Sequence, residues 1–133
     1  MNRKEMIQEL IAAAKEAQKS AYVPYSNYAV GAALLADDNK IYTGCNIENA
    51  SFTPTVCAER VAVFKAISEG AKQVEIIAVV AGEDMGYPCG VCRQVLREFA
   101  PNIEIICLNG AGEERTFTLE ELLPHSFGPE YLQ

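Results

Sequence analysis

The sequence predicts an α/β fold: a three-layer α/β/α sandwich around a mixed, mostly parallel five-stranded sheet. Stretches with helical periodicity alternate with short apolar stretches along most of the chain. Residues 74–81 and 103–108 are nearly continuous apolar runs, which are typical of strands buried on both faces. Residues 29–36 and 40–45 flank an Asp/Asn turn at 37–39 and indicate a hairpin, so we expect the sheet to be mixed.

The first half of the chain supplies one helix, this hairpin and two loops. The helix is predicted over residues 4–20, because its apolar residues form one stripe: Ile7, Leu10, Ile11, Ala14 and Ala17. Pro24 marks a loop at 22–28, ahead of the hairpin. Residues 46–56 are rich in Asn, Ser and Thr and hold Pro54, which favours a second loop.

The second half alternates helices and strands. A helix is predicted over 57–70, with Gly70 as its C-cap, ahead of the first buried strand. After a loop at 82–89, residues 90–99 form another helix that Pro101 stops.

The end of the chain holds a short strand and a short helix. The strand is predicted over residues 115–117, after the second buried strand. Thr118 and Glu121 then form a T-x-x-E capping box, which opens a short helix that ends at Pro124.

Composition indicates one globular domain over residues 1–133, since half of the residues are apolar and 22% are charged. The net charge of −7 is a poor match for a nucleic-acid backbone, so no nucleic-acid partner is expected. The longest apolar run, Ile76 to Ala81, is far too short to span a bilayer, so no membrane partner is expected. The N-terminus has no uninterrupted apolar stretch, so we expect no signal peptide and a cytoplasmic location.

The cysteines point to metal chemistry, because clustered thiols in a reducing compartment serve metal binding or redox reactions. Cys57 lies where one helix is predicted to begin, and Cys89 and Cys92 lie where another begins. A helix N-terminus favours the thiolate, which is the form that binds a metal ion. Cys89 and Cys92 can bind one ion, and Cys57 could complete a trio. Three protein ligands plus water is the pattern of catalytic zinc.

Two further titratable residues bear on this site. Glu59 follows Cys57 by two residues, a spacing that would let its carboxylate reach a metal-bound water and act as general acid and base. Its alternative role is a first-turn glutamate that interacts with the helix dipole. His125, the one histidine, could be a fourth ligand of a structural site, but its loop position favours an exposed side chain.

These motifs carry a resemblance to a known family. Cys57-x-Glu59 and Pro88-Cys89-x-x-Cys92 match the three-cysteine form of the zinc deaminase signature. Over nearly its whole length the sequence resembles the short cytidine deaminases, which are homotetramers of single-domain chains. Further segments carry the resemblance: residues 22–26, 30–34, 44–49 and 121–124. The stretch 46–49 points to free cytidine as the substrate.

The resemblance implies hydrolytic deamination of cytidine and 2′-deoxycytidine to uridine and 2′-deoxyuridine, with release of ammonia. It implies that Cys57, Cys89 and Cys92 hold one zinc ion per chain and that Glu59 moves protons. Arg60 would donate to a thiolate and withdraw charge from the metal, and Gln94 would also support the ligands from outside.

The resemblance also implies the substrate contacts. Asn46 and Glu48 would bind the ribose, and Ala58 would offer its backbone to the pyrimidine. Phe127 would reach a neighbouring subunit's site and stack on the base, although a plug for the C-terminal loop is an equal alternative. Tyr28 stands where the family has phenylalanine; it can still stack, but its hydroxyl needs a partner.

Three other readings remain at this point. Cys89-x-x-Cys92 at a helix start is also the arrangement of a thioredoxin-like redox module, which gives no role to Cys57 and Glu59. A structural zinc protein would need a fourth protein ligand. Blasticidin S deaminase shares the size and the zinc motifs, and the stretch 46–49 favours cytidine over it.

Overall fold

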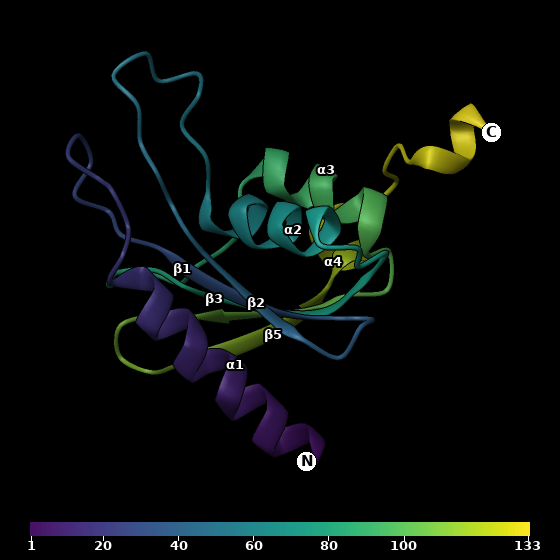
Figure 1. The fold of residues 1–133 in the computed structure, drawn as a ribbon, viewed down its shortest axis with the longest axis horizontal. Helices are drawn as coiled ribbons and strands as arrows, with labels where there is room; N and C mark the ends of the chain where they lie inside the picture. Colours follow the sequence, from purple (N-terminus) through teal and green to yellow (C-terminus); the bar gives the residue numbers. More distant parts are fainter.

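The computed structural model describes all 133 residues and places one five-stranded sheet between two layers of helices (Figure 1). In chain order the elements are α1 (Arg3–Gln18), β1 (Gly31–Ala36), β2 (Ile41–Cys45), α2 (Ala58–Ser68), β3 (Val74–Val80), α3 (Gly90–Phe99), β4 (Glu104–Leu108), β5 (Glu114–Thr118), α4 (Leu119–Leu122) and the 3₁₀ helix η1 (Pro129–Leu132). All the predicted helices and strands are confirmed, with ends shifted by one or two residues, and only η1 was not expected. None of the helices is both long and apolar enough to span a lipid bilayer.

The sheet has the order β2-β1-β3-β4-β5 and is mixed, as predicted. The expectation that it is mostly parallel is wrong, because β3 and β4 form its one parallel pair and the other three pairs are antiparallel. Hairpins join β1 to β2 and β4 to β5, and a hairpin makes its strands antiparallel. The crossover through α2 carries the chain from β2 past β1, so that β3 pairs with β1 in the opposite direction.

The side chains of the central strands alternate between two apolar clusters, which confirms the three layers. On β1, Ala32 and Leu34 belong to the cluster under α2 and α3, whereas Ala33 and Leu35 belong to the cluster under α1. β3 and β4 alternate in the same way. Their nearly continuous apolar sequences follow from burial on both faces.

Two glycines let the layers meet at one end of the hairpin. A Cβ atom on Gly31 would lie 2.0 Å from the carbonyl oxygen of Ala14 in α1. A Cβ atom on Gly44 would lie 2.3 Å from the carbonyl oxygen of Ala58 in α2. Backbone therefore packs on backbone on both faces of the sheet here. The contact at Gly44 fixes the first turn of α2 against the sheet.

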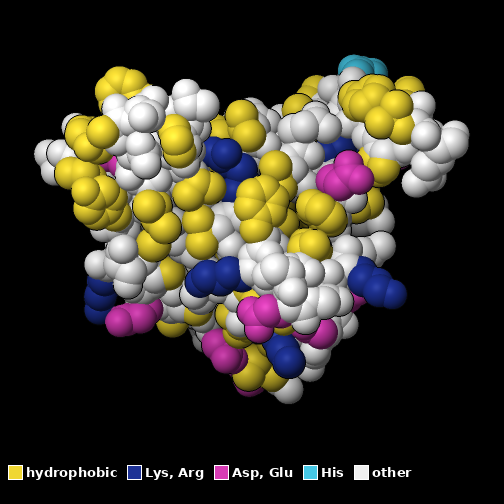
Figure 2. All heavy atoms as spheres, turned by 45° about the horizontal axis from the view of Figure 1, so that its top comes forward, with side chains coloured by type: hydrophobic (Ala, Val, Ile, Leu, Met, Phe, Trp, Pro, Cys, Tyr) yellow, Lys and Arg dark blue, Asp and Glu magenta, His cyan; other side chains and the backbone are white.

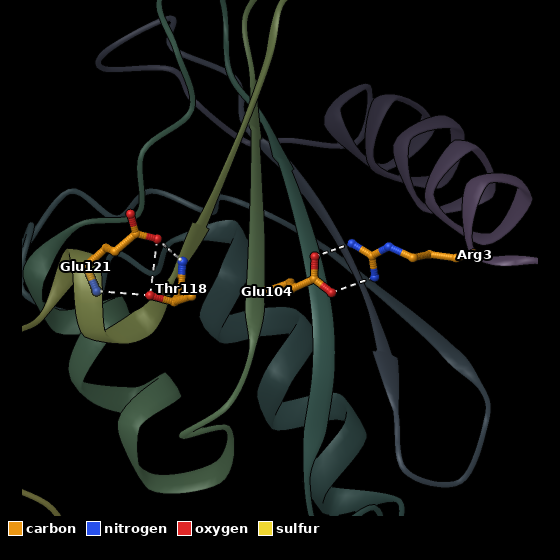
Figure 3. Close-up of polar contacts among 4 residues, drawn as sticks. All are labelled: Arg3, Glu104, Thr118 and Glu121. Carbon is orange, nitrogen blue, oxygen red and sulfur yellow. Dashed lines mark hydrogen bonds and ion pairs between the residues drawn. The ribbon is translucent and has the colours of Figure 1, made fainter.

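Polar contacts secure the ends of two helices (Figure 3). Arg3 pairs with Glu104 through both guanidinium Nη atoms, with 2.5 Å from Nη1 to Oε1, and so ties the start of α1 to the start of β4. The predicted capping box is confirmed: the Thr118 N–H donates to Glu121 Oε1 at 2.8 Å, and the Glu121 N–H donates to Thr118 Oγ1 at 3.2 Å.

Candidate active site

Three thiols meet where α2 and α3 begin. Cys57 is the N-cap of α2, Cys89 is the N-cap of α3, and Cys92 lies in the first turn of α3. The Cys57 and Cys89 sulfurs are 3.7 Å apart, and those of Cys89 and Cys92 are 3.5 Å apart. Tetrahedral zinc with Zn–S bonds of about 2.3 Å requires about 3.8 Å between sulfurs. The trio is therefore spaced for one tetrahedral ion.

Positive charge faces these sulfurs. The Arg60 Nη2 atom donates to Cys57 Sγ at 3.4 Å, as the sequence led us to expect. Contact with the Cys92 thiol, and then with Arg60, lowers the pKa of the Cys57 thiol below its usual range. The Cys92 N–H also points at Cys89 Sγ, at 3.5 Å. These donors favour thiolates and offset the negative charge that three of them bring to a divalent ion.

Glu59 lies in the first turn of α2 and is 3% exposed. Burial raises the pKa of its carboxyl from 4.5 to about 7, and the nearby Cys57 thiolate also raises it. A carboxyl with this pKa can both accept and return a proton at neutral pH, which is what a general acid–base catalyst needs. The reading of Glu59 as a plain helix-dipole residue does not account for this burial.

The thiols and Glu59 form part of a pocket of about 190 Å³. It is lined by Tyr28, Val30, Asn46, Cys57, Ala58, Glu59, Val79, Ala81, Gly86, Tyr87 and Cys89. Typical sites for small ligands have about 300–1,000 Å³. The pocket of one chain is thus small, with chemistry at one wall and mainly apolar side chains at the others.

Asn46 and Glu48 both bind loop backbone. The Asn46 Oδ1 atom accepts from the Val30 N–H at 2.8 Å, and its Nδ2 atom donates to the Tyr28 carbonyl oxygen at 2.7 Å. Asn46 lines the pocket itself, whereas Glu48 lines an adjacent hollow of about 320 Å³. The Ser26 hydroxyl donates to Glu48, lowers the pKa of its carboxyl and keeps it ionised.

Two predicted site residues, Phe127 and Gln94, and the alternative ligand His125 lie away from this pocket. His125 is exposed and does not belong to the thiol cluster. Phe127 is 55% exposed in the C-terminal segment, beyond α3 (Figure 1). The Gln94 amide donates to the Phe127 carbonyl oxygen at 3.0 Å and not to a thiol. Gln94 follows Cys92 by two residues, which puts it on another face of α3, so the structure does not bring it to the ligands.

Tyr87 is an aromatic pocket residue that the sequence did not reveal. Its ring lines the pocket and packs on Phe117, with 5.9 Å between the ring centroids. The available signal was its position, since it comes directly before Pro88 and Cys89. The path of the loop at 82–89 brings Tyr87 to the pocket, and no periodic pattern encodes that path.

Comparison with known proteins decides the family. Residues 4–108 match the model of the cytidine and deoxycytidylate deaminase zinc-binding region. The chain belongs to this deaminase family. The match confirms the resemblance seen in the sequence, and together with the thiol cluster it fits one zinc ion per chain.

Individual relatives of this deaminase agree with the family match. The chain is 48% identical to a cytidine deaminase of Sporosarcina psychrophila, over 95% of this chain and 94% of the relative. It is 47% identical to one of Halalkalibacterium halodurans, over 98% and 97%. The crystal structure of cytidine deaminase from Burkholderia pseudomallei superposes with a TM-score of 0.85 at 43% identity, over 96% of this chain and 100% of that one.

Proposed function

We propose that the deaminase converts cytidine and 2′-deoxycytidine, with one water each, into uridine and 2′-deoxyuridine plus ammonia. The observation that carries this proposal is the position of Glu59, buried beside three thiols spaced for one zinc ion, at a wall of a small pocket. High identity to cytidine deaminases over nearly the whole chain supports the substrate. A redox module would leave both Cys57 and Glu59 without a role.

Each group at the pocket then has a task. When bound by Cys57, Cys89 and Cys92, zinc would lower the pKa of a water and so supply the nucleophile for C4 of the pyrimidine. Glu59 would pass one proton of the attacking water to N3 and then move its second proton, from the new hydroxyl on C4, to the amino group that leaves as ammonia. The backbone of Ala58 binds the pyrimidine.

The sugar is assigned to Asn46 and Glu48. Glu48 is ionised and faces the hollow next to the pocket, where a carboxylate can accept hydrogen bonds from ribose hydroxyls. A phosphate at the same place would be repelled by this charge, which favours nucleosides over nucleotides. Tyr28 contributes its ring to the wall of the base pocket.

Self-association as a homotetramer completes the proposal. The pocket assigned to the base is small, so we expect a neighbouring chain to supply further walls for the substrate. Apolar side chains are spread over the face that carries α2 and α3 (Figure 2). The large exposed ones include Phe64, Val91, Phe127, Tyr131 and Leu132. An exposed apolar surface of this kind marks a contact site, and Phe127 is the aromatic that we assign to the neighbour's pocket.

We assign the reaction to pyrimidine salvage in the cytoplasm, since a reducing compartment keeps the thiols available for the metal. The test is turnover of cytidine by the purified protein, followed by ultraviolet absorbance, with zinc measured on the same sample. We expect turnover and one zinc ion per chain. Turnover of blasticidin S without turnover of cytidine would replace the substrate assigned here.

Glu59→Gln is the matched variant for the catalytic role. The amide keeps the shape of the side chain but cannot move a proton, so we expect zinc to stay bound and turnover to fall to almost nothing. Activity within about tenfold of wild type would remove Glu59 from this role, because general acid–base groups contribute about 10²- to 10⁴-fold.

A further inference from the structure

The C-terminal arm, residues 126–131, is held by one face of α3. Arg97 Nε donates to the Ser126 hydroxyl at 2.8 Å, and Arg97 Nη2 pairs with the Glu130 carboxylate. One turn earlier on the helix, Gln94 Nε2 donates to the Phe127 carbonyl oxygen at 3.0 Å. Gln94 and Arg97 therefore hold the arm at Phe127 itself and at residues before and after it in the chain.

Gly128 shows how closely the arm lies on Arg97. A Cβ atom at this position would be 2.4 Å from Arg97 Cζ and 2.4 Å from its Nη1. Gly128 has φ −150° and ψ 179°, which any residue can adopt, and a Cβ atom here would meet the flexible end of Arg97, so a side chain at this position would displace the guanidinium. The Arg97 side chain is only 17% exposed. The backbone at Gly128 thus covers the Arg97 guanidinium. The guanidinium itself contacts Ser126 before Gly128 and Glu130 after it.

The ring that this arrangement presents faces outward. Phe127 stacks on Tyr131 with 5.2 Å between centroids and 20° between planes. Both rings remain more than half exposed. The contacts with α3 therefore hold the backbone of the arm, while the rings of Phe127 and Tyr131 remain exposed to solvent. A side chain that is ordered before binding loses less conformational entropy when it binds.

We propose that Arg97 is the positioning residue for Phe127, holding the arm in the geometry with which that ring covers the pocket of a neighbouring chain. This rests on the proposed function, which assigns Phe127 to that pocket. α3 carries Cys92 at its start and Arg97 further along, so one rigid helix links a zinc ligand to the arm. A planar guanidinium fork suits two partners on opposite sides of Gly128, and a lysine ammonium would not span them.

The main test is Arg97→Ala, measured by cytidine kinetics, zinc content and the mobility of the arm. We expect KM to rise about two- to tenfold, with zinc content unchanged and kcat changed less than KM. The chain contains no tryptophan, so Phe127→Trp gives a single reporter on the arm. In that background Arg97→Ala should lower the fluorescence anisotropy, a readout that does not depend on turnover.

Three variants separate positioning of the Phe127 ring from a general loss of stability. Gly128→Ala should reproduce the rise in KM, because its Cβ would displace the guanidinium of an otherwise intact Arg97 from the arm. Arg3→Ala removes another arginine paired with a glutamate, far along the chain from the arm, and should leave KM and anisotropy unchanged. The double variant Arg97→Ala/Phe127→Ala should have the KM of Phe127→Ala alone, since both changes remove the same ring from the pocket.

Three results would overturn the inference: an unchanged KM or anisotropy in Arg97→Ala, additive effects in the double variant, or an unchanged KM in Phe127→Ala. Failure of the proposed function looks different, because wild type itself would then not turn over cytidine. The anisotropy measurement would still report whether Arg97 holds the arm.

Discussion

Burial of Glu59 should make the metal-free protein less stable as the pH rises, and Glu59→Gln should remove this loss. Burial raises the pKa of the carboxyl from 4.5 to about 7. A pKa difference of this size between the unfolded and folded states corresponds to about 3 kcal/mol of folding free energy. Zinc is removed for this experiment because a bound cation would change the charge that Glu59 experiences.

The direction follows from proton binding. The folded state binds the Glu59 proton more tightly than the unfolded state, so the contribution of Glu59 to the free energy of unfolding is highest below pH 4.5. It falls as the pH rises from 4.5 to about 7 and then stays level. Glutamine does not titrate. The stability of Glu59→Gln relative to wild type should therefore grow by about 3 kcal/mol between pH 4.5 and pH 8.

The stability difference between Glu59→Gln and wild type is measured by urea denaturation at pH 4.5 and pH 8. Both proteins are kept reduced, and a chelator removes the zinc. Equal protein concentrations are needed, since association also adds to stability. Glu75→Gln is the matched control, because Glu75 is exposed on β3 and should show no such growth in the difference. A stability difference between Glu59→Gln and wild type that stays constant with pH would refute the reasoning.

Three further predictions concern substrate, metal and assembly. Glu48→Ala should weaken cytidine binding by about 1–3 kcal/mol in KM while zinc content stays the same; an unchanged KM would leave residues 46–49 as a structural loop only. Arg60→Ala should reduce zinc affinity or turnover by about 10- to 100-fold, measured by competition with a chelating dye, and an unchanged affinity and rate would show that Arg60 does not assist the thiolates. Mixing inactive Glu59→Gln chains with Phe127→Ala chains should restore some intact sites, and no recovery despite demonstrated chain exchange would argue against a shared site.

Local patterns explain why most elements could be predicted from the sequence. Apart from Glu75 and Glu104 at the starts of β3 and β4, these strands are apolar, which favours burial on both faces. The side chains of Thr118 and Glu121 each accept a hydrogen bond from the other residue's backbone N–H, so the start of α4 needs no distant partner. The cluster of Cys57, Cys89 and Cys92 could be predicted for a similar reason, because each cysteine lies at a fixed position in the first turn or N-cap of a helix.

Long-range choices explain the errors. The pairing of β3 with β1 rather than β2 depends on how the α2 crossover packs, and neither strand's sequence records its neighbour. The orientation of Gln94 depends on where the C-terminal arm lies, and that arm has no periodicity of its own. The position of the Tyr87 ring depends on the path of a loop.

Gly31 and Gly44, where the helical layers touch the hairpin, have a consequence for mutational tolerance. Neither residue does chemistry, yet the smallest side chain at either position would overlap helix backbone by more than an ångström. In a library of single substitutions selected for activity, both positions should be depleted of variants as strongly as the zinc ligands. A map of intolerant positions would therefore outline the hairpin and the metal site together. A measurement of folding would separate the two classes of position, because we expect inactive variants at the zinc ligands to fold and those at Gly31 and Gly44 not to fold.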